Sequence, residues 1–193
     1  FFSKETALRW IREPAIDAIF TGAADFTVRE AADAVRKGIF PRPIPGVICR
    51  DGDKVVDGGP AAAISDLDST GFTDFTGFPN ALYANPMHLP FQSSRGCIWK
   101  CRFCSSCNFW SGFGHMSGDR IFAEIMHHKR LYPEKHHVEF YDLVGNGDIK
   151  ALARFTDLLL SAKIVAGGMN FFGWKINAVI RREMAPDLLH RMR

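Results

Sequence analysis

The sequence predicts an α/β protein with a parallel sheet in its larger part. Three observations predict this fold class: apolar strands and amphipathic helices alternate three times after residue 87, turn residues separate them, and one more strand–helix unit precedes residue 60. Consecutive strand–helix units place their strands in parallel, joined by right-handed crossovers. We therefore expect two α/β regions, of which the second is the larger.

The composition is that of an ordinary globular protein. The 193 residues are 47% hydrophobic and 23% charged, with a formal net charge of +3. These values exclude a disordered tail, a collagen-like repeat and a strongly basic nucleic-acid arm. No apolar run approaches the roughly 18 residues of a membrane span. The chain starts without an initiator methionine or signal peptide and ends inside an expected helix, so we expect an internal piece of a longer protein.

The first region is expected to contain a strand, a helix and a hairpin. A strand over 15–20 precedes a helix that Thr27 caps and Gly38 closes. Two short β segments flank an Asp-Gly-Asp turn and form a hairpin over 46–56. Cys49 lies in this hairpin and is expected to be a small buried residue. The apolar stripe of the helix is predicted at Val28, Ala31, Ala32 and Val35.

Residues 61–86 are expected to link the two regions. They contain several glycines and prolines, three aspartates and no basic residue. Their three phenylalanines, Phe72, Phe75 and Phe78, would not be placed on a free tether. We therefore expect a linker that lies over a protein surface.

The second region is expected to hold three strand–helix units. The predicted strands are 89–93, 136–141 and 169–174, and Ser117 and Asp148 are predicted to cap the first two helices. In such folds the functional sites lie at the carboxyl ends of the strands. The residues predicted to face the core are Ile121, Phe122, Ile125, Met126 and Tyr132 on the first helix, Ile149, Leu152, Phe155, Leu158 and Leu159 on the second, and Met184, Leu188 and Met192 on the third.

A cysteine cluster directly after the first of these strands points to metal chemistry. Cys97, Cys101, Cys104 and Cys107 fall within eleven residues, whereas a disulfide framework would spread its cysteines along a secreted chain. Thiolates favour iron–sulfur clusters or zinc, so we expect a reducing compartment and a cytoplasmic location. Residues 87–193 hold fifteen basic and nine acidic side chains, which suggests an anionic ligand, although a solvated basic surface is equally compatible.

The cysteine motif resembles that of a known family. Ser94-Arg95-Gly96-Cys97, followed by Cys101, Phe103 and Cys104, is similar to the signature of the radical S-adenosylmethionine (SAM) enzymes. The hairpin turn and residues 64–68 are similar to the lead-in of the subgroup that also has a cobalamin-binding domain. The resemblance implies that 1–60 form the C-terminal end of a Rossmann-like cobalamin-binding domain, that 61–86 are a linker, and that 87–193 form the first three units of a partial (β/α)6 barrel.

The resemblance also implies a reaction. A four-iron four-sulfur cluster held by Cys97, Cys101 and Cys104 would bind SAM at its fourth iron and cleave it reductively to a 5′-deoxyadenosyl radical. Cobalamin is implied as a further cofactor, with methylation or rearrangement of a small-molecule or lipid-like substrate, although the DxHxxG cobalamin pattern is absent from this sequence. The implied electron donor is a flavodoxin or ferredoxin. No nucleic-acid partner is indicated.

Two further site residues follow from the same resemblance. Phe103 is expected beside the adenine of SAM, the alternative being packing within the loop. Asp142 is expected near the SAM amino group, the alternative being a carboxylate of a turn, because no Gly-Gly-Glu stands at that position. Trp174, Lys175 and Asn177 either face the site or serve packing and surface charge.

Other polar motifs are expected to be structural. The histidine pairs His127-His128 and His136-His137 lack the helical spacing of a zinc pair and are expected to be solvated or at strand ends. The turn Gly145-Asn146-Gly147 could cradle a phosphate, but a simple turn is favoured.

The rival function is a non-catalytic module. Cys101, Cys104 and Cys107 form a ferredoxin-like run, and Cys97 could complete a closed electron-transfer cluster or a structural zinc site. Such modules are small, whereas this loop opens an α/β array, so the radical enzyme is favoured. A cobalamin-binding module alone is disfavoured because the cysteine loop lies outside that domain.

Overall fold

The computed structural model describes residues 4–64, 66–82, 87–106, 110, 112–165 and 172–193. The chain divides into two compact units, Phe1–Ser65 and Asp66–Arg193. The boundary falls inside the predicted linker, so residues 61–86 are shared between the two units. Each unit is described by itself below.

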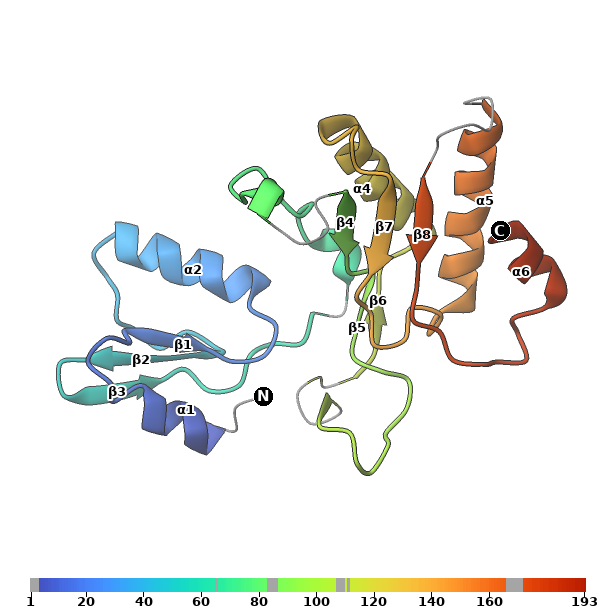
Figure 1. Cartoon of the computed structure of the whole chain (residues 1–193). Coiled ribbons are helices and arrows are strands. Elements are labelled where there is room, and N and C mark those ends of the chain that lie inside the picture. Colours follow the sequence, from blue (N-terminus) through green and yellow to red (C-terminus); the bar gives the residue numbers. More distant parts are fainter. Residues whose placement is uncertain (1–3, 65, 83–86, 107–109, 111, 166–171) are drawn as a thin grey trace. The chain divides into compact units, whose positions relative to one another are not determined.

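The first unit is a three-stranded antiparallel sheet with two helices (Figure 1). The strand order is β1-β2-β3, and the predicted hairpin is confirmed, since Asp51 pairs with Lys54 across a turn in which Gly52 has a φ of 57°. The elements of this unit are α1 (Lys4–Trp10), β1 (Ala18–Phe20), α2 (Asp25–Arg36), β2 (Val47–Asp51) and β3 (Lys54–Asp57).

The two helices cover opposite faces of this sheet. Side chains alternate along β2, so that Val47 and Cys49 pack with α2, whereas Ile48 packs with α1. Cys49 is fully buried, which confirms the structural role predicted for it. The result is a layered α/β/α arrangement around one short sheet (Figure 1).

The start and the buried face of α2 differ from the prediction. The helix begins at Asp25, and the Thr27 hydroxyl donates to the Ala24 carbonyl instead of capping. Val28 and Val35 are exposed, and the buried residues are Ala31 and Ala34. Alanine at these positions lets the helix lie close to the sheet, because a methyl group takes up little space.

The second unit confirms the predicted α/β class. Its main sheet has the order β4-β7-β8 with all strands parallel, and a two-stranded sheet of β5 and β6 stands beside it. Residues 169–171 of the third predicted strand lie outside the described residues. The elements are η1 (Leu67–Ser69), η2 (Asn80–Leu82), β4 (His88–Phe91), β5 (Ser94–Arg95), β6 (Gly114–His115), α4 (Gly118–Leu131), β7 (His137–Phe140), α5 (Ile149–Val165), β8 (Gly173–Lys175) and α6 (Pro186–Arg191).

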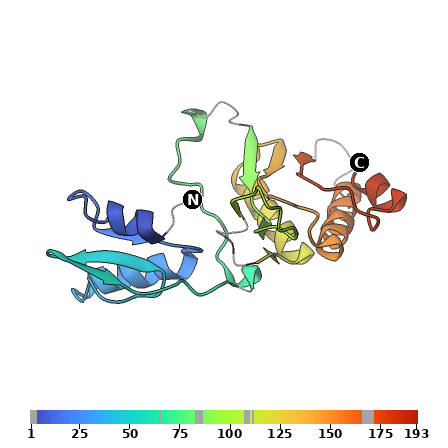
Figure 2. The same ribbon diagram turned by 90° about the horizontal axis from the view of Figure 1, so that it is seen from below.

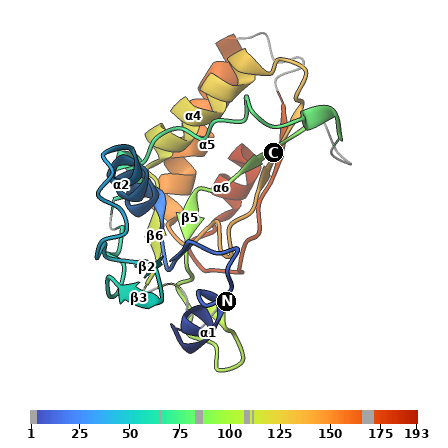
Figure 3. The same ribbon diagram turned by 90° about the vertical axis from the view of Figure 1, so that its left-hand side faces the viewer.

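The predicted caps of the two long helices are confirmed. The Ser117 hydroxyl accepts from the Arg120 N–H at 3.1 Å at the start of α4, and the Asp148 carboxylate accepts from the Ala151 N–H at 2.7 Å at the start of α5. The two helices lie side by side along one face of the β4-β7-β8 sheet (Figure 3). Buried residues of α5 include Leu152, Phe155 and Leu159, as predicted.

An aromatic core joins α5 to the sheet. The Phe140 ring on β7 lies 5.2 Å from Phe91 on β4 and 5.8 Å from Phe155 on α5, measured between centroids. Trp174 on β8 packs 5.5 Å from Phe155, so this side chain belongs to the core. The edge-to-face geometry of these rings is the favoured one.

The opposite face of the sheet is polar. Glu139 on β7 is the centre of this face, because the Lys175 ammonium donates to it at 2.7 Å and the Tyr141 hydroxyl at 3.2 Å. His88 on β4 lies 3.5 Å from the same carboxylate. Strand alternation thus gives one apolar and one charged face.

The face of α4 that turns away from the sheet is covered by the chain before β4. Thr73 N–H donates to the Glu124 carboxylate at 2.8 Å, and the Arg120 guanidinium donates to the Thr70 carbonyl at 2.9 Å. The Phe75 ring lies 5.2 Å from that of His128, which is 1% exposed. The prediction of a solvated His128 is therefore wrong. Between η1 and η2 this covering segment runs without regular structure (Figure 2).

No helix within the described ranges is both long enough and apolar enough to cross a membrane.

Candidate functional site

The cysteine loop extends beyond the carboxyl ends of β4 and β7 (Figure 1). β5 and β6 close its base, where Ser94 pairs with His115 and Arg95 pairs with Gly114. The loop is therefore anchored at both ends to the strands that carry it. This is the end of a parallel sheet at which functional sites are found.

Gly96 directs the chain from β5 into the loop. Its φ is 78°, a left-handed conformation that L side chains rarely adopt. A Cβ atom at this position would lie 1.9 Å from the Gly112 carbonyl oxygen. The two arms of the loop can approach each other here only because residue 96 has no side chain.

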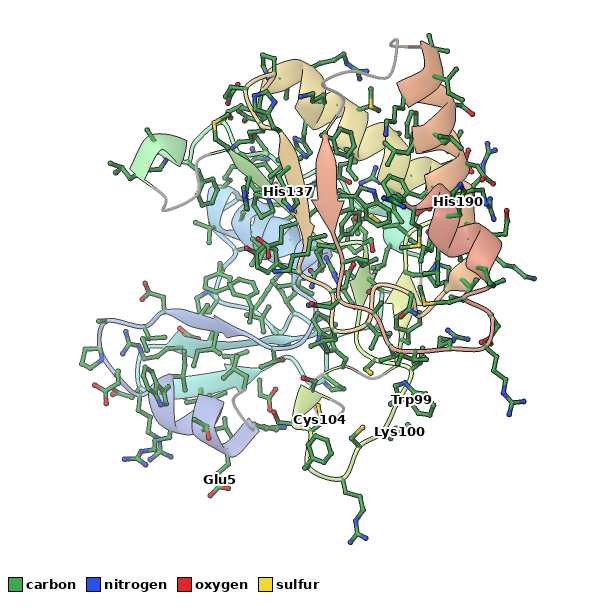
Figure 4. All side chains as sticks on the ribbon, turned by 45° about the vertical axis from the view of Figure 1, so that its right-hand side comes forward. Glu5, Trp99, Lys100, Cys104, His137 and His190 are labelled. Atoms are coloured by element: carbon green, nitrogen blue, oxygen red, sulfur yellow. The ribbon has the colours of Figure 1, made fainter. Side chains whose placement is uncertain are left out.

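The three motif cysteines are carried by this one loop. Cys97 and Cys104 are half-buried and Cys101 is exposed. The Trp99 N–H donates to the Cys97 sulfur at 3.4 Å, a contact that stabilises a thiolate. Trp99 and Lys100 lie on one arm of the loop and Cys104 on the other (Figure 4).

The donor set suits an iron–sulfur cluster. Three thiols lie within eight residues of a loop that a glycine lets bend tightly, and soft thiolates are the ligands that such clusters use. Among the described residues, no three metal-ligating side chains lie close enough together to hold a metal ion. Cys107 lies outside the described residues.

Phe103 projects from the loop. Its side chain is 92% exposed, so the ring is not packed within the loop. The sequence places it directly before Cys104, and the exposed ring is available to contact a ligand held by the loop.

Asp142 is turned toward the base of the cysteine loop. Asp142 is the second residue after the end of β7, and its side chain is 1% exposed. The Ser93 hydroxyl donates to Oδ2 at 2.6 Å, and the Ser94 N–H donates to Oδ1 at 2.6 Å. Burial raises the pKa of Asp142 above its ordinary value, although these two hydrogen bonds oppose the rise. Both carboxylate oxygens thus have partners within the chain.

The loops that follow β7 and β8 are joined through Asn146. This residue is fully buried; its amide donates to the Val179 carbonyl at 2.7 Å and accepts from the Val179 N–H at 3.0 Å. The Arg181 guanidinium donates to the carbonyls of Asn146 and Gly147. The Gly-Asn-Gly segment is therefore a structural turn, as favoured from the sequence.

Lys175 and Asn177 have separate roles. Lys175 pairs with Glu139 on the polar face, and this hydrogen-bonded pair raises the pKa of Lys175 and lowers that of Glu139. Asn177 donates from its amide to the Asp142 carbonyl at 3.2 Å. The sequence did not indicate that Ser93 contacts Asp142 or that the Asn146 side chain is buried. The position of Asn146 between two glycines is the one signal that could have indicated a buried amide.

Comparisons of sequence give two informative relatives. The chain is 30% identical over 135 residues to an uncharacterized methyltransferase of Pyrococcus horikoshii, which covers 67% of this chain and 28% of the relative. It is 26% identical over 117 residues to the anaerobic magnesium-protoporphyrin IX monomethyl ester cyclase of Synechocystis sp., covering 60% of this chain and 23% of the cyclase. The chain thus spans about a quarter of the length of these relatives. No protein-family model matches it.

Comparisons of structure extend over more of the chain. The radical SAM methyltransferase TsrM of Kitasatospora setae, solved with cobalamin and a four-iron four-sulfur cluster bound, superposes with a TM-score of 0.69 at 17% identity, covering 92% of this chain and 36% of TsrM. The cobalamin-dependent radical SAM enzyme OxsB, solved with aqua-cobalamin and SAM bound, gives 0.60 at 17% identity, covering 79% and 22%. The chain therefore has the fold found in part of the cobalamin-dependent radical SAM enzymes.

Proposed function

We propose that this chain is the part of a cobalamin-dependent radical SAM enzyme that holds the iron–sulfur cluster. One observation carries the proposal: three cysteines in the spacing of that family lie on a single loop at the carboxyl ends of parallel strands, in a chain with that fold. The relation in sequence to a methyltransferase and a cyclase supports it.

Cys97, Cys101 and Cys104 are the proposed ligands. Three thiolates hold three irons of a four-iron cluster and leave the fourth position open for a small chelating molecule. When bound, such a cluster supplies the electron that cleaves SAM to a 5′-deoxyadenosyl radical, which abstracts hydrogen from the substrate. The Trp99 N–H supports the Cys97 thiolate, and Lys100 and Arg102 on the exposed loop offset its negative charge.

Phe103 is the residue proposed to contact SAM. Its exposed ring and its position directly before Cys104 support this proposal. The two oxygens of Asp142 accept from Ser93 and Ser94 within the chain. These contacts support a structural role for Asp142, the alternative to a contact with the SAM amino group.

Residues 1–60 are proposed to belong to the cobalamin-binding domain. The layered arrangement of the first unit and the likeness to TsrM over nearly the whole chain support this. Residues 61–86 then connect it to 87–193, the first three units of a partial (β/α)6 barrel. Methylation or rearrangement of a small-molecule or lipid-like substrate is the proposed reaction, with a flavodoxin or ferredoxin as electron donor.

Counting the cluster ligands tests the proposal against a closed electron-transfer cluster. The full-length protein is reconstituted anaerobically with iron and sulfide, with each motif cysteine changed to alanine in turn. We expect Cys97→Ala, Cys101→Ala and Cys104→Ala to lose the four-iron cluster, and Cys107→Ala to keep it, because a thiol outside the motif leaves all three ligands in place. SAM added to the reduced wild type should alter the electron-spin resonance spectrum and yield 5′-deoxyadenosine.

Cys107→Ala is the matched control, since it removes a thiol only three residues after Cys104 in the sequence. If that variant loses its cluster and SAM leaves the wild-type spectrum unchanged, all four thiolates are ligands and the protein is an electron carrier.

A further inference from the structure

We propose that Asp142 is a positioning residue that fixes the base of the cysteine loop, acting through Ser93 and Ser94 and touching neither the cluster nor SAM. The inference rests on the proposed function for the role of the loop. The structural part of the proposal is that the carboxylate at the end of β7 anchors the loop that follows β4. It rests on the contacts of Asp142 with Ser93 and Ser94.

The carboxylate joins two strand ends that are far apart in sequence. Asp142 follows β7, whereas Ser93 and Ser94 follow β4, 49 and 48 residues earlier respectively. The Tyr141 N–H donates to the Phe91 carbonyl at 2.8 Å, so the hydrogen bonding of β7 to β4 continues up to the residue before Asp142. Asp142 is thereby presented to the chain at the point where it leaves the sheet.

The residues that Asp142 holds belong to both arms of the loop. The Ser93 carbonyl accepts from the Met116 N–H at 2.8 Å, and Ser94 pairs with His115 on the returning arm. Cys97 comes only three residues after Ser94. A displacement of Ser94 is therefore transmitted to the first thiol across at most about 10 Å of chain.

The main chain of Asp142 makes a third connection. Its carbonyl accepts from the Asn177 amide at 3.2 Å, and the Asn177 carbonyl accepts from the Gly145 N–H at 2.8 Å. The loop that follows β8 is thus tied to the same residue. Asp142 links the segments that follow all three parallel strands at the end where the cysteine loop stands.

The hydrogen-bond chemistry distinguishes positioning from a contact with SAM. Positioning requires an acceptor for the Ser94 N–H and any polar partner for the Ser93 hydroxyl, and asparagine supplies both because a hydroxyl can donate or accept. A contact with the SAM ammonium requires the negative charge, which asparagine lacks. If Asp142 positions the loop, Asp142→Ala therefore changes trypsin cleavage and iron content, whereas Asp142→Asn does not. If Asp142 binds SAM, both variants lose the response to SAM equally.

The test compares Asp142→Asn, Asp142→Ala and Ser93→Ala in the full-length protein. The matched control is Asp157→Ala, which removes an exposed carboxylate from α5 that pairs with Arg191. Trypsin cleavage after Lys100 and Arg102 is followed in the metal-free protein, because both residues are exposed on the loop. Iron and sulfide content and the electron-spin resonance spectrum are then measured after reconstitution, before and after SAM is added.

We expect Asp142→Ala to be cleaved on the order of tenfold faster than wild type and to incorporate less than half the iron, because the two buried hydrogen bonds that hold Ser93 and Ser94 are lost. Asp142→Asn and Asp157→Ala should stay within about twofold of wild type in both measurements. Ser93→Ala removes one bond and no charge, so it should show a smaller change in the same direction. If Asp142→Ala fails to fold, the Ser93→Ala variant shows whether the loop depends on the hydrogen bonds of Asp142.

Two results would overturn the inference. Wild-type cleavage and iron content in both Asp142→Ala and Ser93→Ala would show that the loop does not depend on Asp142. An intact cluster with an equal loss of the SAM response in Asp142→Asn and Asp142→Ala would place Asp142 on SAM instead. If the wild type takes up no four-iron cluster, the proposed function fails, and the trypsin comparison still decides whether Asp142 holds the loop.

Discussion

At Gly96 and Gly52 the chain can turn because glycine has no Cβ atom. Both have positive φ angles, 78° and 57°, and both stand where the chain must reverse or bend. A Cβ on Gly52 would meet nothing within 4 Å, whereas on Gly96 it would meet the Gly112 carbonyl at 1.9 Å. Gly52 is therefore needed for its backbone conformation alone, and Gly96 also for the close approach of the two arms of the cysteine loop.

Replacing each of these glycines by alanine separates the two effects. Both changes impose the left-handed conformation on an L residue, which costs about 1–2 kcal/mol in the free energy of folding. Only Gly96→Ala also forces the arms of the loop apart. We expect thermal unfolding to show destabilisation in both variants, and iron analysis after reconstitution to show a loss only in Gly96→Ala. Equal iron content in the two variants would contradict the role given to residue 96.

At the scale of elements, α4 is unusual because its second buried face is polar. Glu124 and His128 are each 1% exposed, one turn apart, whereas Phe122 and Met126 are only half-buried. The Arg120 guanidinium lies 3.0 Å from Glu124 Oε2 and 4.1 Å from the centroid of the Phe72 ring. The covering segment buries these polar groups, and its backbone supplies part of their hydrogen bonding.

The acid sensitivity of this packing can be predicted from Glu124. Burial raises its pKa, but the nearby His128, the Thr73 N–H and the Arg120 charge outweigh it and hold the pKa below the ordinary value of 4.5. For a carboxyl group with a lowered pKa, the stabilisation is fully present above the unfolded pKa and is lost as pH falls through the folded one. Wild-type stability should therefore decline below about pH 4.5.

Glu124→Gln should lose about 1–3 kcal/mol of stability at pH 7, because a buried charged acceptor is removed, and should show a weaker decline in acid. Thermal unfolding of both proteins between pH 7 and pH 3.5 measures this difference. Glu5→Gln, at an exposed position on α1, is the control and should keep the wild-type pH dependence. A pH dependence of Glu124→Gln equal to that of wild type would rule out this carboxylate as the source.

At the scale of the whole molecule, the two faces of the β4-β7-β8 sheet in the second unit have different roles. One face contributes to stability by apolar packing, and the other carries charged side chains. One face packs its aromatic side chains against α5, and the other carries the Glu139–Lys175 ion pair. Apolar burial is the main stabilising contribution to folding, whereas ion pairs in water contribute little. The helix-covered face is therefore expected to contribute most of the stability of the second unit, and the polar face little.

Substitutions on the two faces test this division. Phe155→Ala empties a fully buried site between Phe140 and Trp174 and should cost about 3–5 kcal/mol in the free energy of unfolding. Lys175→Met breaks an exposed ion pair and should leave the unfolding midpoint in urea nearly unchanged. A large shift of that midpoint for Lys175→Met would mean that the polar face also stabilises the fold.

The sequence by itself determined the features that depend on neighbouring residues. The caps Ser117 and Asp148, the turn at Gly52 and the alternation of parallel strands with helices in the second unit could be predicted, because each is encoded within one turn of helix, one hairpin or one strand–helix unit. Helix α1 and strands β5 and β6 were not predicted. The cysteine spacing likewise indicates metal chemistry, because four thiols within eleven residues of the sequence are suited to bind a soft metal. The assignment of Cys97, Cys101 and Cys104 as ligands stays a prediction.

Only the tertiary structure decided which side chains meet across long separations. Glu124 receives its hydrogen bond from Thr73, 51 residues away, and Asp142 receives one from Ser94, 48 residues away. Polar residues in a helix or after a strand are by default assigned to solvent or a turn, so the sequence gives no sign that these groups are buried. Their burial becomes favourable only when the fold brings the donors to them, because an unpaired buried carboxylate is too costly to keep.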